Sequence, residues 1–227
     1  MVFVEDGSLM IKILYEDNHL LVVVKPVNMP VCEDNSGDDD LLSYLKRYLK
    51  DKYNKPGNVY LGLIHRLDRP VGGIMVFAKT SKCASRLSEQ VRLKRFNKRY
   101  YAVVCGFLSG NGVLKDKLLK DSRTNMVCVD SRGKDSSLEY NVISTKNGLS
   151  LVDINLITGR SHQIRVQFSS RGYPLYGDQR YNKSASVGEQ IALFSYYLSF
   201  YHPISGDLME FKECIPNRKP FNIFIDI

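Results

Sequence analysis

The apolar positions of this chain recur with two different spacings. Residues 151–157, LVDINLI, alternate between polar and apolar side chains, which is the pattern of a half-buried strand. Residues 41–53 carry leucines and tyrosines at helical spacing, and residues 82–95 form a second, basic amphipathic pattern after Ser81, a residue suited to cap a helix. Further strands are predicted at residues 11–15, 19–24, 100–105, 126–130, 138–143 and 208–214. Strands that outnumber helices predict an α+β fold with a largely antiparallel sheet.

The pentapeptide His65-Arg66-Leu67-Asp68-Arg69 places one carboxylate between two guanidinium groups, just before an apolar run that is predicted to be a strand. Both cations favour the ionised form of Asp68, and arginine binds carboxylates and phosphates alike. An anionic nucleophile in such a cationic setting suits a polyanionic substrate. The alternative is a surface cluster of ion pairs, which would add little to stability.

A second polar segment follows the strand predicted at residues 151–157. A Thr158-Gly159 turn leads to Arg160 and then to Ser161, the predicted N-cap of a helix over residues 162–171. A strand, a glycine turn and a helix N-terminus beside an arginine together predict an anion site.

The helix predicted after this turn has one apolar face. Ile164 and Phe168 lie four residues apart and are expected to face the core, whereas Arg165 is offset by one residue, on a flank from which it can reach a cleft. The alternative for Arg165 is an ordinary solvated arginine. For His162 the alternative is a helix-capping histidine or another satisfied polar group.

Charge is distributed unevenly along the chain. The net charge is +8 and the sequence pI is about 9.2, which favours a polyanionic partner. Between Lys82 and Arg99 there are seven basic residues and one acid, Glu89. Acids cluster instead at residues 33–40, in a predicted solvated loop. Localised positive charge is what a surface that follows phosphates requires.

The five cysteines are widely spaced, and their odd number argues against both a disulfide framework and a zinc site. No metal is therefore expected. The N-terminal residues lack the organisation of a signal peptide, and no apolar run approaches the length of a membrane span. These features predict a cytoplasmic protein that does not bind membranes.

HRLDR, followed by a glycine turn and MVFAK, and the later TGRSHQIR strongly resemble the motifs of the RluA-type pseudouridine synthases. Other segments resemble the family in family order, over roughly residues 12–215. One departure is visible, because Pro70-Val71-Gly72 stands where the family usually has a polar residue followed by Thr-Ser. The other segments that resemble the family are VVVKPVNMPV, KRYYAVVCG, GKDSSLEYNVI, GYPLYGDQRY and LFSYYLSFYHPISG.

The resemblance implies the pseudouridine-synthase fold, a mixed sheet with flanking helices and a central RNA-binding cleft. We expect one catalytic domain over residues 1–227, without the N-terminal S4-type module that some members carry. The implied reaction converts specific uridines of structured RNA, in tRNA, large-subunit rRNA or both, to pseudouridine. It is redox-neutral, so no cofactor is expected. A monomer without an obligatory protein partner is expected as well.

The resemblance also assigns roles to individual residues. Asp68 matches the covalent nucleophile, Tyr100 the active-site tyrosine that can stack on a flipped base, and Arg165 the arginine that pairs with the nucleophilic carboxylate. Arg66 matches a residue that contacts RNA. The residues predicted to bind RNA are Arg66, Arg69, Lys82, Arg86, Arg92, Lys94, Arg95, Arg160 and His162.

Two other functions are compatible with parts of the pattern. A non-catalytic RNA-binding protein of the same fold would use Asp68 only in ion pairs. A hydrolase of phosphorylated or glycosidic small molecules would need a second acid or metal-binding carboxylates. The HRLDR motif itself contains no second acid.

Overall fold

The computed structural model describes residues 11–34 and 36–225, which form two compact units. The first unit contains the described residues up to Phe96 together with Tyr197–Glu213, and the second contains Asn97–Tyr196 with the described residues from Cys214 onward. That the chain acts as a single catalytic domain with a central cleft stays a prediction.

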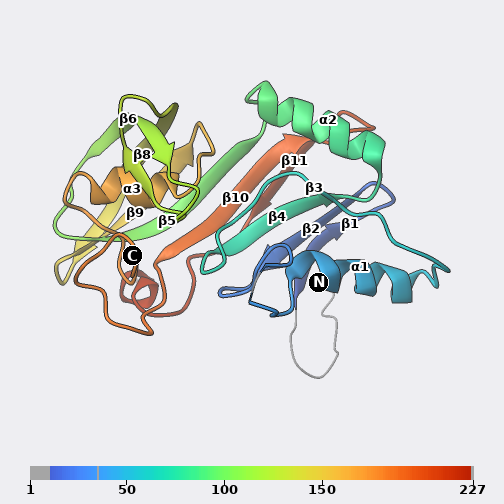
Figure 1. Ribbon diagram of the computed structural model, residues 1–227, viewed down its shortest axis with the longest axis horizontal. Coiled ribbons are helices and arrows are strands. Elements are labelled where there is room, and N and C mark those ends of the chain that lie inside the picture. The colour runs from blue at the N-terminus through green and yellow to red at the C-terminus, as the bar shows by residue number, and fades with distance from the viewer. Residues whose placement is uncertain (1–10, 35, 226–227) are drawn as a thin grey trace. The chain divides into compact units, whose positions relative to one another are not determined.

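The first unit is built on an antiparallel sheet with two helices (Figure 1). Strand β2 pairs with β1 and β4, β3 pairs with β4, and β11 pairs with β10, all antiparallel. The elements are β1 (Lys12–Glu16), β2 (Leu20–Lys25), α1 (Leu41–Lys52), β3 (Gly62–Leu63), β4 (Gly72–Ala78), α2 (Ser81–Arg92), the C-terminal part of β10 (Leu193–Tyr201) and β11 (Leu208–Lys212).

The core of the first unit explains why its strands form where they do. Every residue of β4 is buried, and Val22 and Val76 on neighbouring strands pack with Leu87 of α2. Leu198 and Phe200 of β10 complete the same cluster, and each has 0% of its surface exposed. Burial on this scale stabilises each large apolar side chain by roughly 1.5–3 kcal/mol.

The two helices of the first unit begin at capping side chains. Asp40 accepts a hydrogen bond from the backbone N of Ser43 at 3.0 Å, and Thr80 accepts one from Cys83 N at 3.2 Å. The prediction that Ser81 caps the second helix is wrong by one residue, because Ser81 is already its first residue. Among the described residues, no helix combines the length and the apolar character needed to cross a membrane.

The second unit contains five strands that pair antiparallel in the order β5-β9-β8-β6-β7. Helix α3 packs through Val166 on Leu118 of β6 and Val127 of β7. The elements are β5 (Asn97–Cys105), β6 (Asn111–Lys120), β7 (Val127–Val129), β8 (Lys134–Lys146), β9 (Leu149–Leu156), α3 (Gln163–Ser169), the N-terminal part of β10 and a 3-10 helix (Phe221–Phe224).

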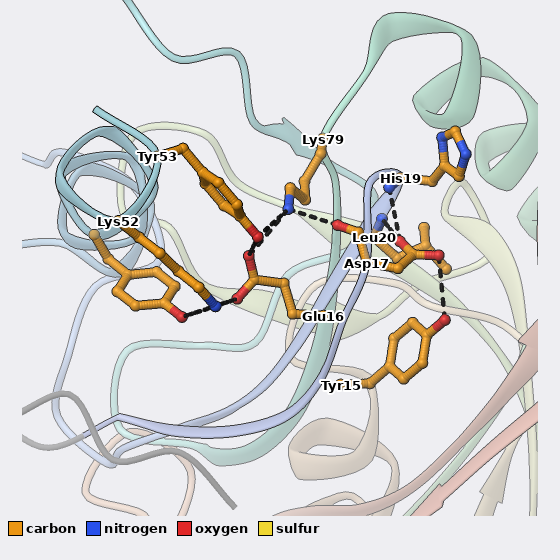
Figure 2. A network of polar contacts seen from close by, with 9 residues as sticks. Tyr15, Glu16, Asp17, His19, Leu20, Lys52, Tyr53 and Lys79 are labelled. Atoms are coloured by element: carbon orange, nitrogen blue, oxygen red, sulfur yellow. Dashed lines mark hydrogen bonds and ion pairs between the residues drawn. The ribbon is translucent and has the colours of Figure 1, made fainter. Parts of the chain in front are cut away.

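Glu16, at the end of β1, is the centre of a polar network in the first unit (Figure 2). Its Oε2 accepts hydrogen bonds from Tyr48 Oη and Lys52 Nζ, each at 2.8 Å. Its Oε1 accepts from Tyr53 Oη at 2.6 Å and Lys79 Nζ at 3.0 Å. The network joins the C-terminal end of α1 to the sheet, and the Glu16 side chain is only 7% exposed.

We expect Glu16→Gln to lower the stability of the protein in a pH-dependent way. Burial alone would raise the pKa of Glu16, but the hydrogen bonds from Lys52, Tyr53, Lys79 and Tyr48 lower it from 4.5 to about 2. A carboxyl whose folded pKa is depressed stabilises the fold above its unfolded pKa, and this contribution is lost as pH falls toward the folded value. After allowance for solvent screening, we expect a loss of about 2 kcal/mol at pH 7.

Urea unfolding of wild type and Glu16→Gln at pH 7, 4 and 2.5 measures this contribution. The difference between the two proteins should shrink as pH falls. Glu89→Gln is the matched control, because Glu89 pairs with Arg92 on an exposed helix face and should have no measurable effect. A stability gap that is as large at pH 2.5 as at pH 7 would contradict the proposed contribution of the ionised carboxylate.

Candidate active site

Asp68 lies in a tight turn just before β4. The turn is closed by Val71 N, which donates a hydrogen bond to Asp68 O at 2.9 Å. Leu67 and Val71 are buried on either side of the turn, whereas Asp68 is half-buried and Arg66 and Arg69 are exposed. The buried neighbours fix the backbone of the turn, so the carboxylate of Asp68 is held at the surface of a rigid element.

The two glycines that follow this turn allow β4 to approach β2 closely. A Cβ at Gly72 would lie 3.1 Å from both Lys25 O and Val27 Cγ1. Gly73, which pairs with Lys25, has a φ of +130°, a conformation that residues with side chains rarely adopt. The departure of this segment from the family pattern therefore includes a glycine, Gly72, that packs against the opposite backbone.

Lys25 anchors the turn from inside the first unit. Its Nζ donates to Met29 O at 2.7 Å, Pro26 O at 2.9 Å and Arg69 O at 3.0 Å, and the residue is only 1% exposed. Three acceptors match the three N–H groups of an ammonium. Burial lowers the pKa of Lys25 to about 7, although the negative charge of Asp68 acts in the opposite direction. Sequence reasoning missed this role; the signal is a lysine directly after the apolar run LLVVV.

Arg69 binds the acidic segment at residues 33–40. Its guanidinium forms an ion pair with Asp38 and lies 3.8 Å from a carboxylate oxygen of Asp34. The prediction that this acidic segment is a solvated loop is wrong for Asp40, which is buried because it caps α1. Binding of RNA by Arg66 and Arg69 stays a prediction.

The basic residues around α2 differ in their surroundings. Arg86 Nη1 donates to Pro203 O at 2.5 Å, and Arg92 forms an ion pair with Glu89. The helix ends at Arg92, so the predicted end at residue 95 is wrong and the last two basic residues lie in the turn that follows. Lys82, Lys94 and Arg95 are exposed. These three are the strongest candidates of the helix region for contact with phosphates.

Tyr100 and Tyr101 of β5 occupy different environments in the second unit. Tyr100 is 5% exposed and pairs with Ile154 of β9. Tyr101 is half-buried and stacks on Tyr196, with ring centroids 3.7 Å apart. This agrees with the alternation expected along a strand. The role of Tyr100 in stacking on a flipped base stays a prediction.

The segment before α3 differs from its prediction. The helix begins only at Gln163, and the preceding His162 adopts a left-handed conformation with φ of 51°, so Ser161 is not its N-cap. The buried Gln163 holds the turn instead, because its Oε1 accepts hydrogen bonds from Thr158 Oγ1 at 2.8 Å and Arg160 N at 3.0 Å. The helix has seven residues and ends at Ser169, and the anion site predicted at its N-terminus stays a prediction.

Arg165 is buried, so the alternative of a solvated helix arginine is wrong. It is 6% exposed, and its Nε and Nη2 donate to Asp178 Oδ2 at 2.8 Å and Oδ1 at 2.7 Å. Its guanidinium also lies 5.2 Å from the ring centre of Tyr181. Ile164 and Phe168 are buried as predicted. Sequence reasoning missed Asp178 and Tyr181, although both lie in the family-like segment GYPLYGDQRY.

Two residues predicted to bind RNA lie next to α3. His162 Nδ1 is 2.7 Å from Tyr181 Oη, in agreement with the alternative of a satisfied polar histidine. Arg160 is exposed, and its Nε donates to Asp135 O at 3.0 Å. The structure thus places Arg160, His162 and Arg165 together in the second unit with Tyr100, and Asp68 with its arginines in the first. Pairing of Arg165 with Asp68 stays a prediction.

Comparison with known proteins identifies the family. Residues 19–170 match the RNA pseudouridylate synthase family. Ribosomal large subunit pseudouridine synthase D of Zymomonas mobilis is 34% identical over 226 residues, which cover 93% of this chain and 71% of the relative. Ribosomal large subunit pseudouridine synthase C of Buchnera aphidicola from Acyrthosiphon pisum is 30% identical over 217 residues, or 90% of this chain and 67% of the relative.

A solved structure shows the same fold. Human RNA pseudouridylate synthase domain containing 4 matches 90% of this chain and 88% of its own chain with a TM-score of 0.74, at 24% identity. This likeness confirms the predicted pseudouridine-synthase fold. The match over residues 19–170 and the two bacterial relatives show that the chain belongs to the RNA pseudouridylate synthase family and is an isomerase, as HRLDR and TGRSHQIR predict.

Proposed function

We propose that this chain isomerises uridines of large-subunit ribosomal RNA to pseudouridine, with Asp68 as the covalent nucleophile. The observation that carries the proposal is the rigid, half-buried turn at Asp68, anchored by the buried ammonium of Lys25. The choice of RNA is supported by the relatives from Zymomonas mobilis and Buchnera aphidicola, whose names refer to the ribosomal large subunit.

The reaction sets the requirements for the nucleophile. The glycosidic C–N bond of uridine breaks, the base rotates, and a C–C bond forms between the same base and the same ribose. Substrate and product have the same atoms and the same oxidation state. A carboxylate that adds covalently and later leaves holds one fragment during this exchange and is regenerated at the end. Asp68 supplies that carboxylate.

The target uridine must leave its stack before Asp68 can reach it. Extrusion of a base costs a few kcal/mol, which stacking and polar contacts in the enzyme offset. Tyr100 provides the stacking face, Arg66 contacts the RNA beside the vacated position, and Arg165 orients the carboxylate of Asp68. Unpaired loop bases of a folded RNA are the least costly to extrude, so we expect the target to lie in a loop.

Detection of the product nucleoside tests the proposed function. The purified protein is incubated with unmodified transcripts of large-subunit rRNA and, separately, of tRNA, in excess chelator, and the RNA is digested to nucleosides. Pseudouridine in the rRNA supports the proposal. Pseudouridine in tRNA alone would overturn the proposed substrate, and its absence from both RNAs despite measurable binding would overturn the proposed function.

We expect the exposed cations near α2 to act on RNA through its phosphates. Replacement of Lys82, Lys94 and Arg95 by Gln should weaken binding to every RNA. Each phosphate contact that is lost should reduce the slope of log affinity against log salt by roughly 0.7–0.9. Single-turnover rates at saturating RNA should stay near those of the wild type, because these residues do not contact the reacting base.

Filter binding at several salt concentrations measures the slope. Lys50→Gln is the control, since Lys50 is exposed on α1 and should leave the slope unchanged. If the triple variant instead loses its rate at saturation while its salt slope is unaltered, then α2 supports catalysis and the phosphates follow another surface.

A further inference from the structure

We propose that Asp178 is the positioning residue of Arg165, which fixes the plane and direction of its guanidinium for catalysis. This inference rests on the proposed function, in which Arg165 orients the nucleophilic carboxylate. It is carried by contacts within the second unit alone, and Asp178 itself is not a residue to which the family motifs assign a role.

The carboxylate of Asp178 is fully buried, and both of its oxygens accept hydrogen bonds. Its side chain has 0% of its surface exposed. In addition to the two bonds from Arg165, Oδ1 accepts hydrogen bonds from Arg180 N at 3.1 Å and Tyr181 N at 3.3 Å. A buried carboxylate is costly unless it is paired and hydrogen-bonded, and here both conditions are met. Arg165 is therefore paired with a carboxylate whose position is fixed by backbone hydrogen bonds.

The bidentate geometry determines how Arg165 can act on a second group. Two parallel N–H···O bonds hold the guanidinium in the plane of the Asp178 carboxylate. These bonds use the Nε–H and one N–H of Nη2, so a further carboxylate bound by Arg165 must approach Nη1 or the second N–H of Nη2, at the end of the guanidinium that faces away from Asp178. A lysine at this position could not reproduce the fork. Asp178 thus selects one direction for the catalytic contact of Arg165.

The turn that begins at Asp178 adds a second support. Asn182 N donates to Asp178 O at 2.8 Å, and this turn carries the Tyr181 ring, over which the guanidinium carbon of Arg165 lies 5.2 Å from the ring centre. Tyr181 Oη accepts a hydrogen bond from Val127 N at 3.0 Å, which fixes the ring on β7. Burial raises the pKa of Tyr181, so the ring remains a neutral phenol. The guanidinium is therefore held by the carboxylate of Asp178 and by the face of the Tyr181 ring.

Asp178→Asn tests the positioning of Arg165 with almost no change in the shape of the side chain. The amide oxygen can keep the hydrogen bonds from Arg180 N, Tyr181 N and Arg165 Nη2, whereas the amide nitrogen would face Arg165 Nε, donor against donor. We expect the single-turnover rate at saturating RNA to fall by about 10²-fold, the usual cost of misplacing a catalytic group. The affinity for RNA should stay within about threefold, because Asp178 is buried.

Asp116→Asn is the matched control. Asp116 also binds an arginine through both oxygens, Arg171 at 2.9 and 3.2 Å, and it accepts a bond from Gln167 at 2.7 Å in the same unit. It does not contact Arg165 among the contacts described. Asp116→Asn should lower the melting temperature of the protein but leave the single-turnover rate unchanged.

A double-mutant cycle shows whether Asp178 acts through Arg165. Arg165→Met should itself be slow, and adding Asp178→Asn to it should slow the reaction no further, since the residue through which Asp178 acts is gone. The double variant leaves neither charge buried without its partner, so it should fold even where a single variant does not. Arg165→Lys replaces Arg165→Met in the cycle if circular dichroism shows the latter to be unfolded.

The outcomes separate this inference from the proposed function. A wild-type rate for folded Arg165→Met would overturn the proposed role of Arg165. A slow Arg165 variant combined with a wild-type rate for Asp178→Asn would overturn only the role of Asp178. Multiplicative losses in the double variant would also overturn it, because they would show that Asp178 acts independently of Arg165.

Discussion

Asp68→Asn protein should bind structured RNA with wild-type affinity and form no detectable pseudouridine. The amide has nearly the shape of the carboxylate but cannot act as the anionic nucleophile. The backbone of the turn should survive, because it is closed by the main-chain bond from Val71 N to Asp68 O and by the Lys25 bond to Arg69 O. We expect turnover to fall by at least about 10⁴-fold, as for other enzymes that lose a covalent nucleophile.

Nucleoside analysis of single-turnover reactions measures this loss, and gel-shift titration measures binding. Asp34→Asn is the control, because Asp34 is an exposed carboxylate of the same unit, near Arg69, and its loss should leave the rate unchanged. Near-wild-type turnover by Asp68→Asn protein purified from a host without the endogenous enzyme would eliminate Asp68 as the nucleophile. Equal loss of binding and turnover would point to a role in RNA recognition instead.

Lys25→Met should cost about 3 kcal/mol of stability, a large fraction of what a domain possesses. The substitution keeps the length of the side chain but leaves the carbonyls of Pro26, Met29 and Arg69 without the donor that they share. A buried acceptor without a donor costs about 1–3 kcal/mol; the bond to Met29 O is buried, and the bonds to Pro26 O and Arg69 O are part-buried and cost less. Relief from burying an ammonium offsets part of this sum, which is why the expected loss is near the lower limit.

Urea unfolding at pH 7 measures the effect of Lys25→Met. Lys50→Met is the matched control, since Lys50 is exposed on α1, and it should change stability by less than about 0.5 kcal/mol. Folded Lys25→Met protein should also turn over slowly, because the turn at Asp68 has lost the bond to Arg69 O. An unfolding midpoint equal to that of the wild type would show that the three carbonyls find other partners.

Local sequence patterns predict much of the fold. Leu41, Leu45 and Leu49 recur at helical spacing and are all buried on α1, and residues 151–157 correspond closely to β9. Strand β6 is not among the predicted strands, because only Leu114 and Leu118 of its ten residues are buried. A strand that is largely polar on both faces gives no periodic apolar signal.

The exact start of a helix depends on which of several neighbouring polar side chains caps it. Thr80 and Ser81 are adjacent hydroxyl residues, and either could cap α2 by composition alone. Before α3, the hydroxyl of Ser161 suggests a cap, but the turn is held by the side chain of Gln163. Such competition between neighbouring side chains is decided by tertiary packing, so it cannot be read from a capping pattern.

The supports of the candidate active site are harder to predict than its reactive residues. HRLDR and TGRSHQIR reveal Asp68 and Arg165 because their residues are contiguous in sequence. Lys25 and Arg69 form a hydrogen bond although they are 44 residues apart in sequence, and Arg165 and Asp178 are 13 residues apart. Neither spacing matches a local periodicity. Contacts of this kind follow from the fold, and they become visible only when the chain is folded.

The division of β10 between the two units has a consequence for the order of folding during synthesis. Residues Leu193–Tyr196 of this strand belong to the second unit, whereas the following residues, with Leu198 and Phe200, complete the core of the first. A nascent chain that has emerged only as far as Phe96 therefore lacks part of that core. The N-terminal unit cannot reach its final packing on the ribosome until nearly the whole chain has been translated, although domains usually fold in order from the N-terminus.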